Sequence, residues 1–218
     1  MDAAHEEGFV IRSLLWELVC PETQRLLMGL LGYDEKEASR FCLDYFDRFY
    51  VLHKIGHIIL HKFDPNHQQT AANTEFLANL FALKYLQYKR EDALLVDLVA
   101  RVEGILAAHH AVFAFDIPKM DRLFPQYRKD LRTYAAFHFN SLLEGLSFVD
   151  EFPAVLDRIS QHHLTSLNHA IVLRHGTHGR QLINECLQTV FETNTDVPSV
   201  TLQYCDSLQL DNLDLVVT

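Results

Sequence analysis

The sequence has little glycine and little proline, 8 and 6 residues respectively in a chain of 218. These residues mark the many turns of sandwich and barrel proteins, so their scarcity argues against such folds and favours long helices. A chain of this length fits one domain, and a hydrophobic fraction of 49% is enough to build a buried core.

Positive charge is also scarce. The 19 Lys and Arg residues stand against 29 Asp and Glu, which gives a net charge of −10 with histidine neutral. The basic pairs Lys89-Arg90 and Arg128-Lys129 are short and isolated. An acidic chain repels a phosphate backbone, so we expect no nucleic-acid partner.

Cysteine motifs and long apolar runs are missing as well. The four cysteines form no CxxC pair, so neither a disulfide framework nor a cysteine zinc site is indicated. The N-terminal residues have no basic and apolar regions of a signal peptide. No stretch approaches the ~18 uninterrupted apolar residues that a membrane span needs. We therefore expect a soluble, cytoplasmic protein without a membrane partner.

Apolar residues recur at helical spacing along most of the chain. Gly32 is a typical helix stop and Asp34 a typical helix cap, while Pro118 is expected to end a helix. The spacing predicts helices over about 9–18, 24–31, 35–63, 74–89, 91–117, 129–147, 153–174 and 177–192. The expected fold class is therefore mainly α.

The last part of the chain differs from the rest. The segments VTLQYC and LDLVVT contain several β-branched residues. They predict one or two strands, or an extended arm lying on the body of the protein. We expect a single mainly helical domain over 1–192 and an extended C-terminal tail over 193–218. One hypothesis is that the tail lies in the cleft of the protein as a substrate-like strand.

The segment from Leu52 to His61 carries the clearest chemical pattern. His53 and His57 are four residues apart on a predicted helix, so their imidazoles lie on one face and can bind one ion. Two ligands hold a metal poorly, and a third is expected from another element. Glu75 is the candidate, because it opens the next helix after a loop long enough for that helix to fold back.

The residues around these three support the pattern. Asn79, one turn after Glu75, is placed to accept a hydrogen bond from the far nitrogen of a ligating histidine. Gly56 suits the close approach of another backbone, and Ala78 and Ala82 suit tight helix packing. Two histidines satisfied by their neighbours or by solvent are the alternative if the H-x-x-x-H pair is taken alone, but the joint pattern favours a shared metal site.

This pattern resembles a known family. HKIGHIILH followed by EFLANLFA is similar to the gluzincin-type zincin metallopeptidases, especially the small ImmA/IrrE-like regulatory peptidases, which carry H-E-x-G-H and a downstream E-x-x-A-N-x-F-A helix. The resemblance covers about 52–82. It implies a zincin-like helical domain with an active-site helix and an adjacent ligand helix, and zinc bound by His53, His57 and Glu75 near Asn79. Iron or another divalent metal is the alternative.

Lys54 departs from the family pattern. In the family this position is a glutamate that takes a proton from the metal-bound water, and losing a general base typically costs about 10²–10⁴ in rate. A lysine depressed in pKa by burial could itself act as a base, or its ammonium could stabilise an oxyanion in another reaction. A third possibility is that catalysis was lost and the scaffold was kept for binding.

The remaining histidines show weaker signs of a functional role. His138 lies in an apolar helix, where a core histidine with a polar partner is the favoured interpretation and an extra ligand or acid is the alternative. His61 and Tyr50 could line the pocket, but helix-dipole and packing roles explain them equally well. The adjacent pairs His109-His110 and His162-His163 each offer at most one side chain to a site. The last three histidines of the sequence, His169, His175 and His178, are expected in a loop.

Three functions remain open from the sequence. The first is a zincin-like metal-dependent enzyme with altered or impaired hydrolysis of a peptide, amide or small carbonyl substrate, with Lys54 as the altered catalytic group. The second is an inactive pseudo-peptidase that binds a peptide or a regulatory protein partner. The third is an all-helical non-haem metal oxidase-like protein in which the same ligands, with or without His138, bind iron.

Overall fold

The computed structural model describes residues 8–63, 70–112, 116–127, 129–150, 181–183, 185–186, 199–206 and 216–217. These residues are mostly helical, which confirms the mainly α class. The α-helices are α1 (Pro21–Leu31), α2 (Glu35–Cys42), α3 (Val51–Phe63), α4 (Ala71–Tyr88), α5 (Asp92–Ala108), α6 (Ile117–Tyr127) and α7 (Leu131–Phe148). In the described part of the chain, no helix combines the length and the apolar character needed to cross a membrane.

A small sheet forms where the first helix was predicted. Residues Gly8–Leu14 are strand β1, so the helix expected over 9–18 is wrong. Phe9, Ile11 and Ser13 are buried, while the intervening residues are partly exposed, which is the period of two that a strand produces. The β-branched residues of this segment and its pairing with a distant strand outweigh the helical spacing of its leucines.

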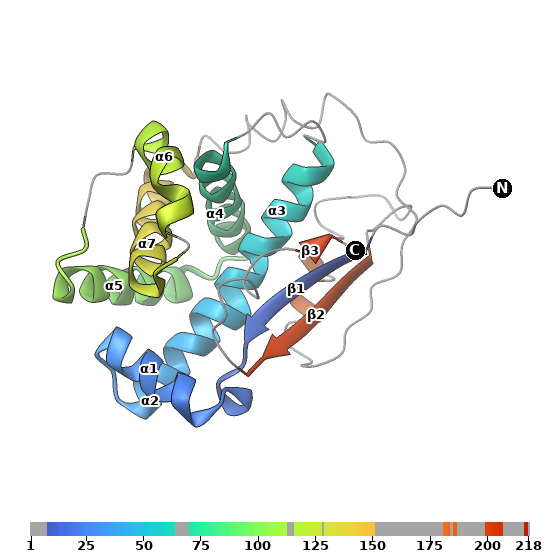
Figure 1. The fold of residues 1–218 in the computed structure, drawn as a ribbon. Coiled ribbons are helices and arrows are strands. Elements are labelled where there is room, and N and C mark those ends of the chain that lie inside the picture. Colours follow the sequence, from blue (N-terminus) through green and yellow to red (C-terminus); the bar gives the residue numbers. More distant parts are fainter. Residues whose placement is uncertain are drawn as a thin grey trace.

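Two strands from the C-terminal tail flank β1. Strand β2 (Ser199–Cys205) pairs with it in parallel over its whole length, and β3 (Val216–Val217) pairs with it antiparallel, giving the order β2-β1-β3. The described residues of β2 and β3 are thus part of the sheet beside α3, in agreement with the strands predicted there (Figure 1). Tyr204 on β2 donates a hydrogen bond to the buried carboxylate of Asp47.

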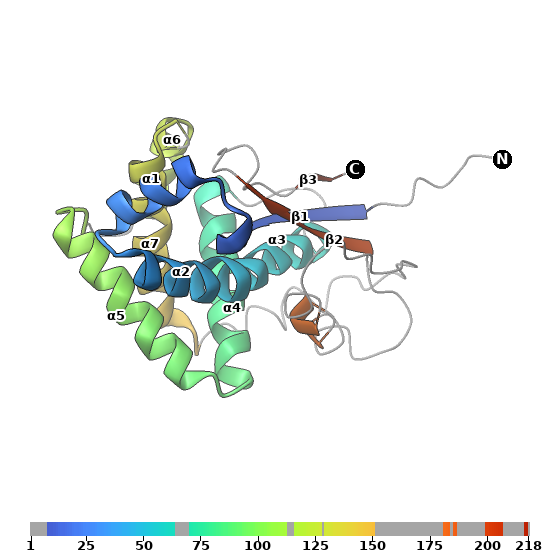
Figure 2. The same ribbon diagram turned by 90° about the horizontal axis from the view of Figure 1, so that it is seen from below.

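Residues 35–63 form one continuous helical rod that begins with α2 and ends with α3. Gly32 ends α1 with a φ of 70°, and the Asp34 carboxylate caps α2 by accepting from the Glu37 backbone N–H at 2.8 Å, both as predicted. A π-helical segment, η2 (Leu43–Tyr50), joins α2 to α3. Figure 2 shows the rod running toward the sheet. Wide helical turns of this kind often occur beside functional sites.

Two helix boundaries differ from those predicted. α4 begins at Ala71 because the Thr70 side chain caps it, a few residues before the expected start. α5 ends at Ala108, and a separate helix, α6, follows with Pro118 in its first turn, where a missing N–H is tolerated. The helix expected over 153–174 lies outside the described residues; in the one expected over 177–192, the described residues 181–183 and 185–186 are helical.

The packing of α3 on α4 brings the predicted site residues together. A Cβ atom added to Gly56 would lie 3.0 Å from Ala78 Cα and 3.1 Å from its carbonyl oxygen, so the two backbones nearly touch. Ala78 and Ala82 are fully buried at this contact, as their size suggested. In Figure 1, α3 lies between α4 and the sheet, and α7 packs against the other side of α4.

We predict that Gly56→Ala lowers the free energy of unfolding by about 1–3 kcal/mol, because the added methyl group meets backbone atoms that cannot turn away. Urea unfolding followed by circular dichroism measures the change. The matched control is Gly104→Ala in α5, where nothing lies within 4 Å of the added carbon and a gain of about 0.5–1 kcal/mol is expected. Equal effects of the two substitutions would contradict the close approach.

Candidate metal centre

Three of the predicted ligands converge on one point. His53 and His57 lie one turn apart on α3, and Glu75 lies in the first part of α4. The Nε2 atoms of His53 and His57 lie 3.0 and 3.2 Å from Glu75 Oε2, and 3.0 Å from each other. The expected fold-back of α4 against α3 produces this arrangement, because it places the first turns of α4 beside the middle of α3.

A fourth side chain reaches the same carboxylate from another helix. His138 on α7 places Nδ1 3.8 Å from Glu75 Oε2. One ligand atom each from His53, Glu75 and His138 lie within 4.8 Å of one another, and all three residues are buried. In the sequence, only its position in the middle of an otherwise apolar helix distinguished His138. The described residues thus place three imidazoles around one carboxylate.

Burial determines the charge of these groups. It lowers the pKa of His53 to about 3, although a hydrogen bond with Glu75 partly offsets this, and it lowers the pKa of His138 to about 4. Burial alone would raise the pKa of Glu75. The positive charge of neighbouring imidazoles and hydrogen bonds from His53 and His57 outweigh burial and hold that pKa well below its ordinary value. At neutral pH the cluster therefore contains an ionised carboxylate and two neutral imidazoles able to act as ligands.

Protons fit the triangle of His53 Nε2, His57 Nε2 and Glu75 Oε2 less well than a cation does. If both nitrogens carry hydrogen and donate to the carboxylate, two N–H groups crowd together at one oxygen atom, with the nitrogens only 3.0 Å apart. If only one carries hydrogen, the lone pair of the other nitrogen faces the carboxylate at hydrogen-bond distance. A cation inside the triangle satisfies all three atoms at once, so the donor set fits a metal ion.

The outer nitrogens of two of these histidines have no hydrogen-bond partner among the residues that the structure describes. Within the described part of the chain, His53 Nδ1 and His138 Nε2 are buried and have no hydrogen-bond partner. The buried Asn79 donates its amide N–H to Ser141 Oγ at 2.8 Å, so the hydrogen bond expected between Asn79 and a ligating histidine is not formed with His53. A metal ion would bind through the other nitrogen of each ring, so these two outer nitrogens have no partner in the described residues whether or not an ion is bound.

Lys54 is buried at the edge of the cluster, with an exposed fraction of only 2%. Its ammonium nitrogen lies 5.0 Å from the centre of the Tyr50 ring, an arrangement that stabilises a cation. The Tyr50 ring in turn stacks on His53, with centroids 5.6 Å apart and an angle of 20° between the rings. The charge of Lys54 contributes to the low pKa values of His53 and His138.

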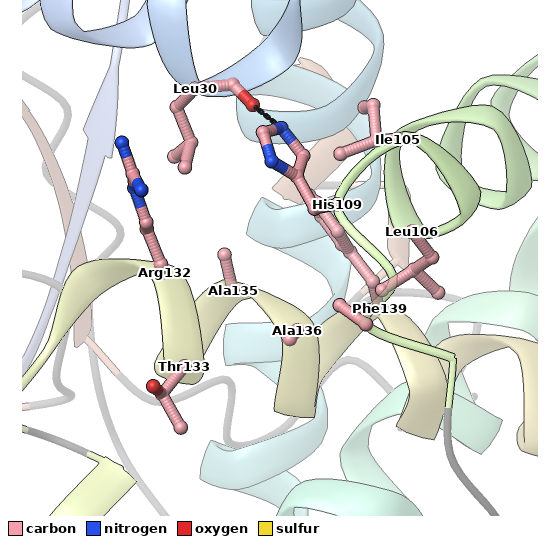
Figure 3. Close-up of a pocket in the computed structure, with 10 residues that line it drawn as sticks. Leu30, Ile105, Leu106, His109, Arg132, Thr133, Ala135, Ala136 and Phe139 are labelled. Carbon is pink, nitrogen blue, oxygen red and sulfur yellow. Dashed lines mark hydrogen bonds between the residues drawn. The ribbon is translucent and has the colours of Figure 1, made fainter.

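Other histidines lie away from the cluster. The His61 ring packs edge-on against Phe9 of β1. His109 donates to the Leu30 carbonyl at 2.5 Å and lines a concavity of about 320 Å³ between α1, α5 and α7 (Figure 3). Arg132 stands at the edge of that concavity, whose floor includes Ala136 and other apolar side chains. The adjacent pair at 162–163 and the histidines at 169, 175 and 178 lie outside the described residues.

No family model, curated protein or solved structure matches this chain. The zincin resemblance therefore stays a prediction from the motif, and what the site does is inferred from its own geometry.

We predict that the protein in the presence of EDTA loses about 4 kcal/mol of unfolding free energy between pH 7 and pH 5 through His53 and His138. Both pKa values fall from the ordinary 6.5 on folding, to about 3 and about 4. Below about pH 6.5 the unfolded chain therefore binds more protons than the folded one, and stability decreases as the pH falls toward these values.

Urea unfolding at a series of pH values measures this dependence. Replacing one of the two histidines, in His138→Asn, should remove roughly half of it. An identical pH dependence in the His138 variant and the wild type would show that this imidazole is not held neutral by burial.

Proposed function

We propose that this protein binds a divalent transition metal on a zincin-like scaffold, with His53, His57 and Glu75 as ligands, and that its hydrolytic chemistry is altered or impaired. The observation that carries the proposal is the convergence of the three ligand atoms, which lie 3.0–3.2 Å apart in a buried position. Ligands about 2.0–2.1 Å from a tetrahedral ion are separated by roughly 3.3 Å, close to these distances.

Zinc is the metal we propose. Two or more imidazoles and one carboxylate suit zinc, although the same donors also bind iron or copper. The four cysteines of the described residues are free, and they lie outside the cluster. When bound, the metal would supply a Lewis acid that polarises a coordinated oxygen. Metal analysis distinguishes the zinc protein from the iron-dependent oxidase-like alternative.

Lys54 is the reason for proposing impaired hydrolysis. It occupies the place of the proton-accepting glutamate in the motif that this segment resembles, and its nitrogen lies over the Tyr50 ring, where an ammonium is stabilised. An ammonium accepts no proton, and beside a dication it also weakens metal binding. Its remaining chemical capacity is to donate hydrogen bonds to an oxygen that carries negative charge, such as that of a peptide, amide or carbonyl substrate.

A second candidate function is that of a pseudo-peptidase that binds a peptide or a regulatory protein without cleaving it. The burial of Lys54 within the cluster favours it, because a buried cation in this place opposes the proton transfer that hydrolysis needs. In both functions His53, His57 and Glu75 hold the metal.

Metal analysis of the purified full-length chain tests the proposal directly. We expect about one zinc per chain by plasma mass spectrometry, and less than about a tenth of that in Glu75→Gln or His53→Ala, because the loss of a ligand weakens zinc binding sharply. The control is His109→Ala, an exposed histidine away from the cluster. Circular dichroism checks that each variant is folded. Stoichiometric metal in folded Glu75→Gln would overturn the ligand assignment.

We also predict that Lys54→Met tightens zinc binding by roughly tenfold or more, because the substitution removes a buried positive charge beside the ion at nearly constant side-chain volume. Competition with a chromophoric chelator measures the dissociation constant. The control is Lys84→Met on α4, where the lysine pairs with the exposed Asp150. Equal affinities of the wild type and Lys54→Met would show that the charge of Lys54 does not act on the metal.

A further inference from the structure

The fourth side chain at the cluster bears on what the metal can do. A hydrolytic zinc centre has three protein ligands and keeps one position for water or substrate, whereas a structural zinc centre has four protein ligands. His138 approaches Glu75 from α7, opposite the helix that carries the other two histidines. Its position therefore decides between an open and a closed site.

We propose that His138 is the fourth protein ligand, so that the metal site is closed and the ion cross-links α3, α4 and α7 instead of binding a substrate. This inference rests on the proposed metal function and specifies it. It assigns the protein to the class of metal-stabilised scaffolds and favours the binding function over the enzymatic one.

The distances bring His138 close to two of the other proposed ligands. His53, Glu75 and His138 each offer one ligand atom within 4.8 Å of the others. The His138 Nδ1 to Glu75 Oε2 distance of 3.8 Å is about 0.5 Å longer than the roughly 3.3 Å between ligands of a tetrahedral zinc ion. At 3.8 Å the pair is too far apart for a hydrogen bond, so such a bond does not account for the approach.

Aromatic neighbours hold the His138 ring in its place. Tyr134 lies edge-on to it with centroids 4.4 Å apart, and Phe137 lies edge-on at 5.3 Å. The His53 ring is 5.6 Å away at an angle of 78°. A ring fixed on several sides loses little conformational freedom when it binds a metal, so this packing pre-organises His138 as a ligand.

The space beside His138 is too small for a substrate. A cavity of about 50 Å³ reaches His138 and is lined almost entirely by apolar surface, including Tyr45, Tyr50 and Tyr134. That volume holds a few water molecules at most, and its lining offers them few polar partners. A peptide bond cannot enter the site through this cavity.

Cobalt substitution tests the proposal, because Co²⁺ replaces Zn²⁺ and its visible absorption is strong in four-coordinate sites and weak at higher coordination numbers. The full-length chain is loaded with Co²⁺ and titrated with acetohydroxamate, a small ligand that binds a metal with an open position. We expect a strong four-coordinate spectrum that acetohydroxamate leaves unchanged.

The variant His138→Ala should open the site. We expect its Co²⁺ spectrum to weaken, to respond to acetohydroxamate and to recover when free imidazole is added, and its dissociation constant for Zn²⁺ to rise roughly 100-fold or more. Thr133→Ala, a change on the first turn of the same helix, should behave as wild type. His138→Asn repeats the measurement with a smaller change of volume, in case the alanine variant is unfolded.

The possible failures are distinct. A wild-type chain that binds no Co²⁺ or Zn²⁺ overturns the proposed metal function, and this inference with it. A wild-type chain that binds Co²⁺ with a spectrum responding to acetohydroxamate overturns the closed site alone, since three ligands then hold the ion and His138 is only a buried neighbour of the site.

Discussion

The carboxylate of Glu75 is the group on which the centre of this structure depends. It is buried, ionised and surrounded by imidazoles from two other helices. A buried negative charge destabilises a fold unless positive charge and hydrogen-bond donors surround it. Here His53 and His57 on α3 supply the hydrogen bonds, and His138 on α7 lies 3.8 Å from the same carboxylate. The near contact of backbones at Gly56 and Ala78 fixes the distance between α3 and α4. The geometry of three helices is therefore tied to one side chain.

The local parts of this arrangement could be predicted from the sequence. The spacing of His53 and His57 places both on one face of a helix because helical periodicity depends only on neighbouring residues. Gly56 and the small residues of α4 indicated a close helix contact for the same local reason. The helix caps at Asp34 and Gly32 could also be predicted, because each depends only on residues within its own turn.

The parts that the sequence did not predict are set by distant residues. Phe9 and Leu14 have helical spacing, but β1 exists because residues near the other end of the chain pair with it. The break between α5 and α6 follows the first-turn position of Pro118, which is compatible with a helix start as well as a helix end. His138 shows no local motif, and only the packing of α7 on α4 brings it to Glu75.

The parallel pairing of β1 with β2 constrains how the chain reaches its native state. β1 is the central strand of the sheet, yet its neighbours come from the last part of the sequence. During synthesis β1 must therefore wait until residues 199–205 have emerged before its backbone groups are paired with β2, while helices such as α3 and α4 can form from local contacts much earlier. The helical body is available first, and closure of the sheet is the step that couples the two ends of the chain.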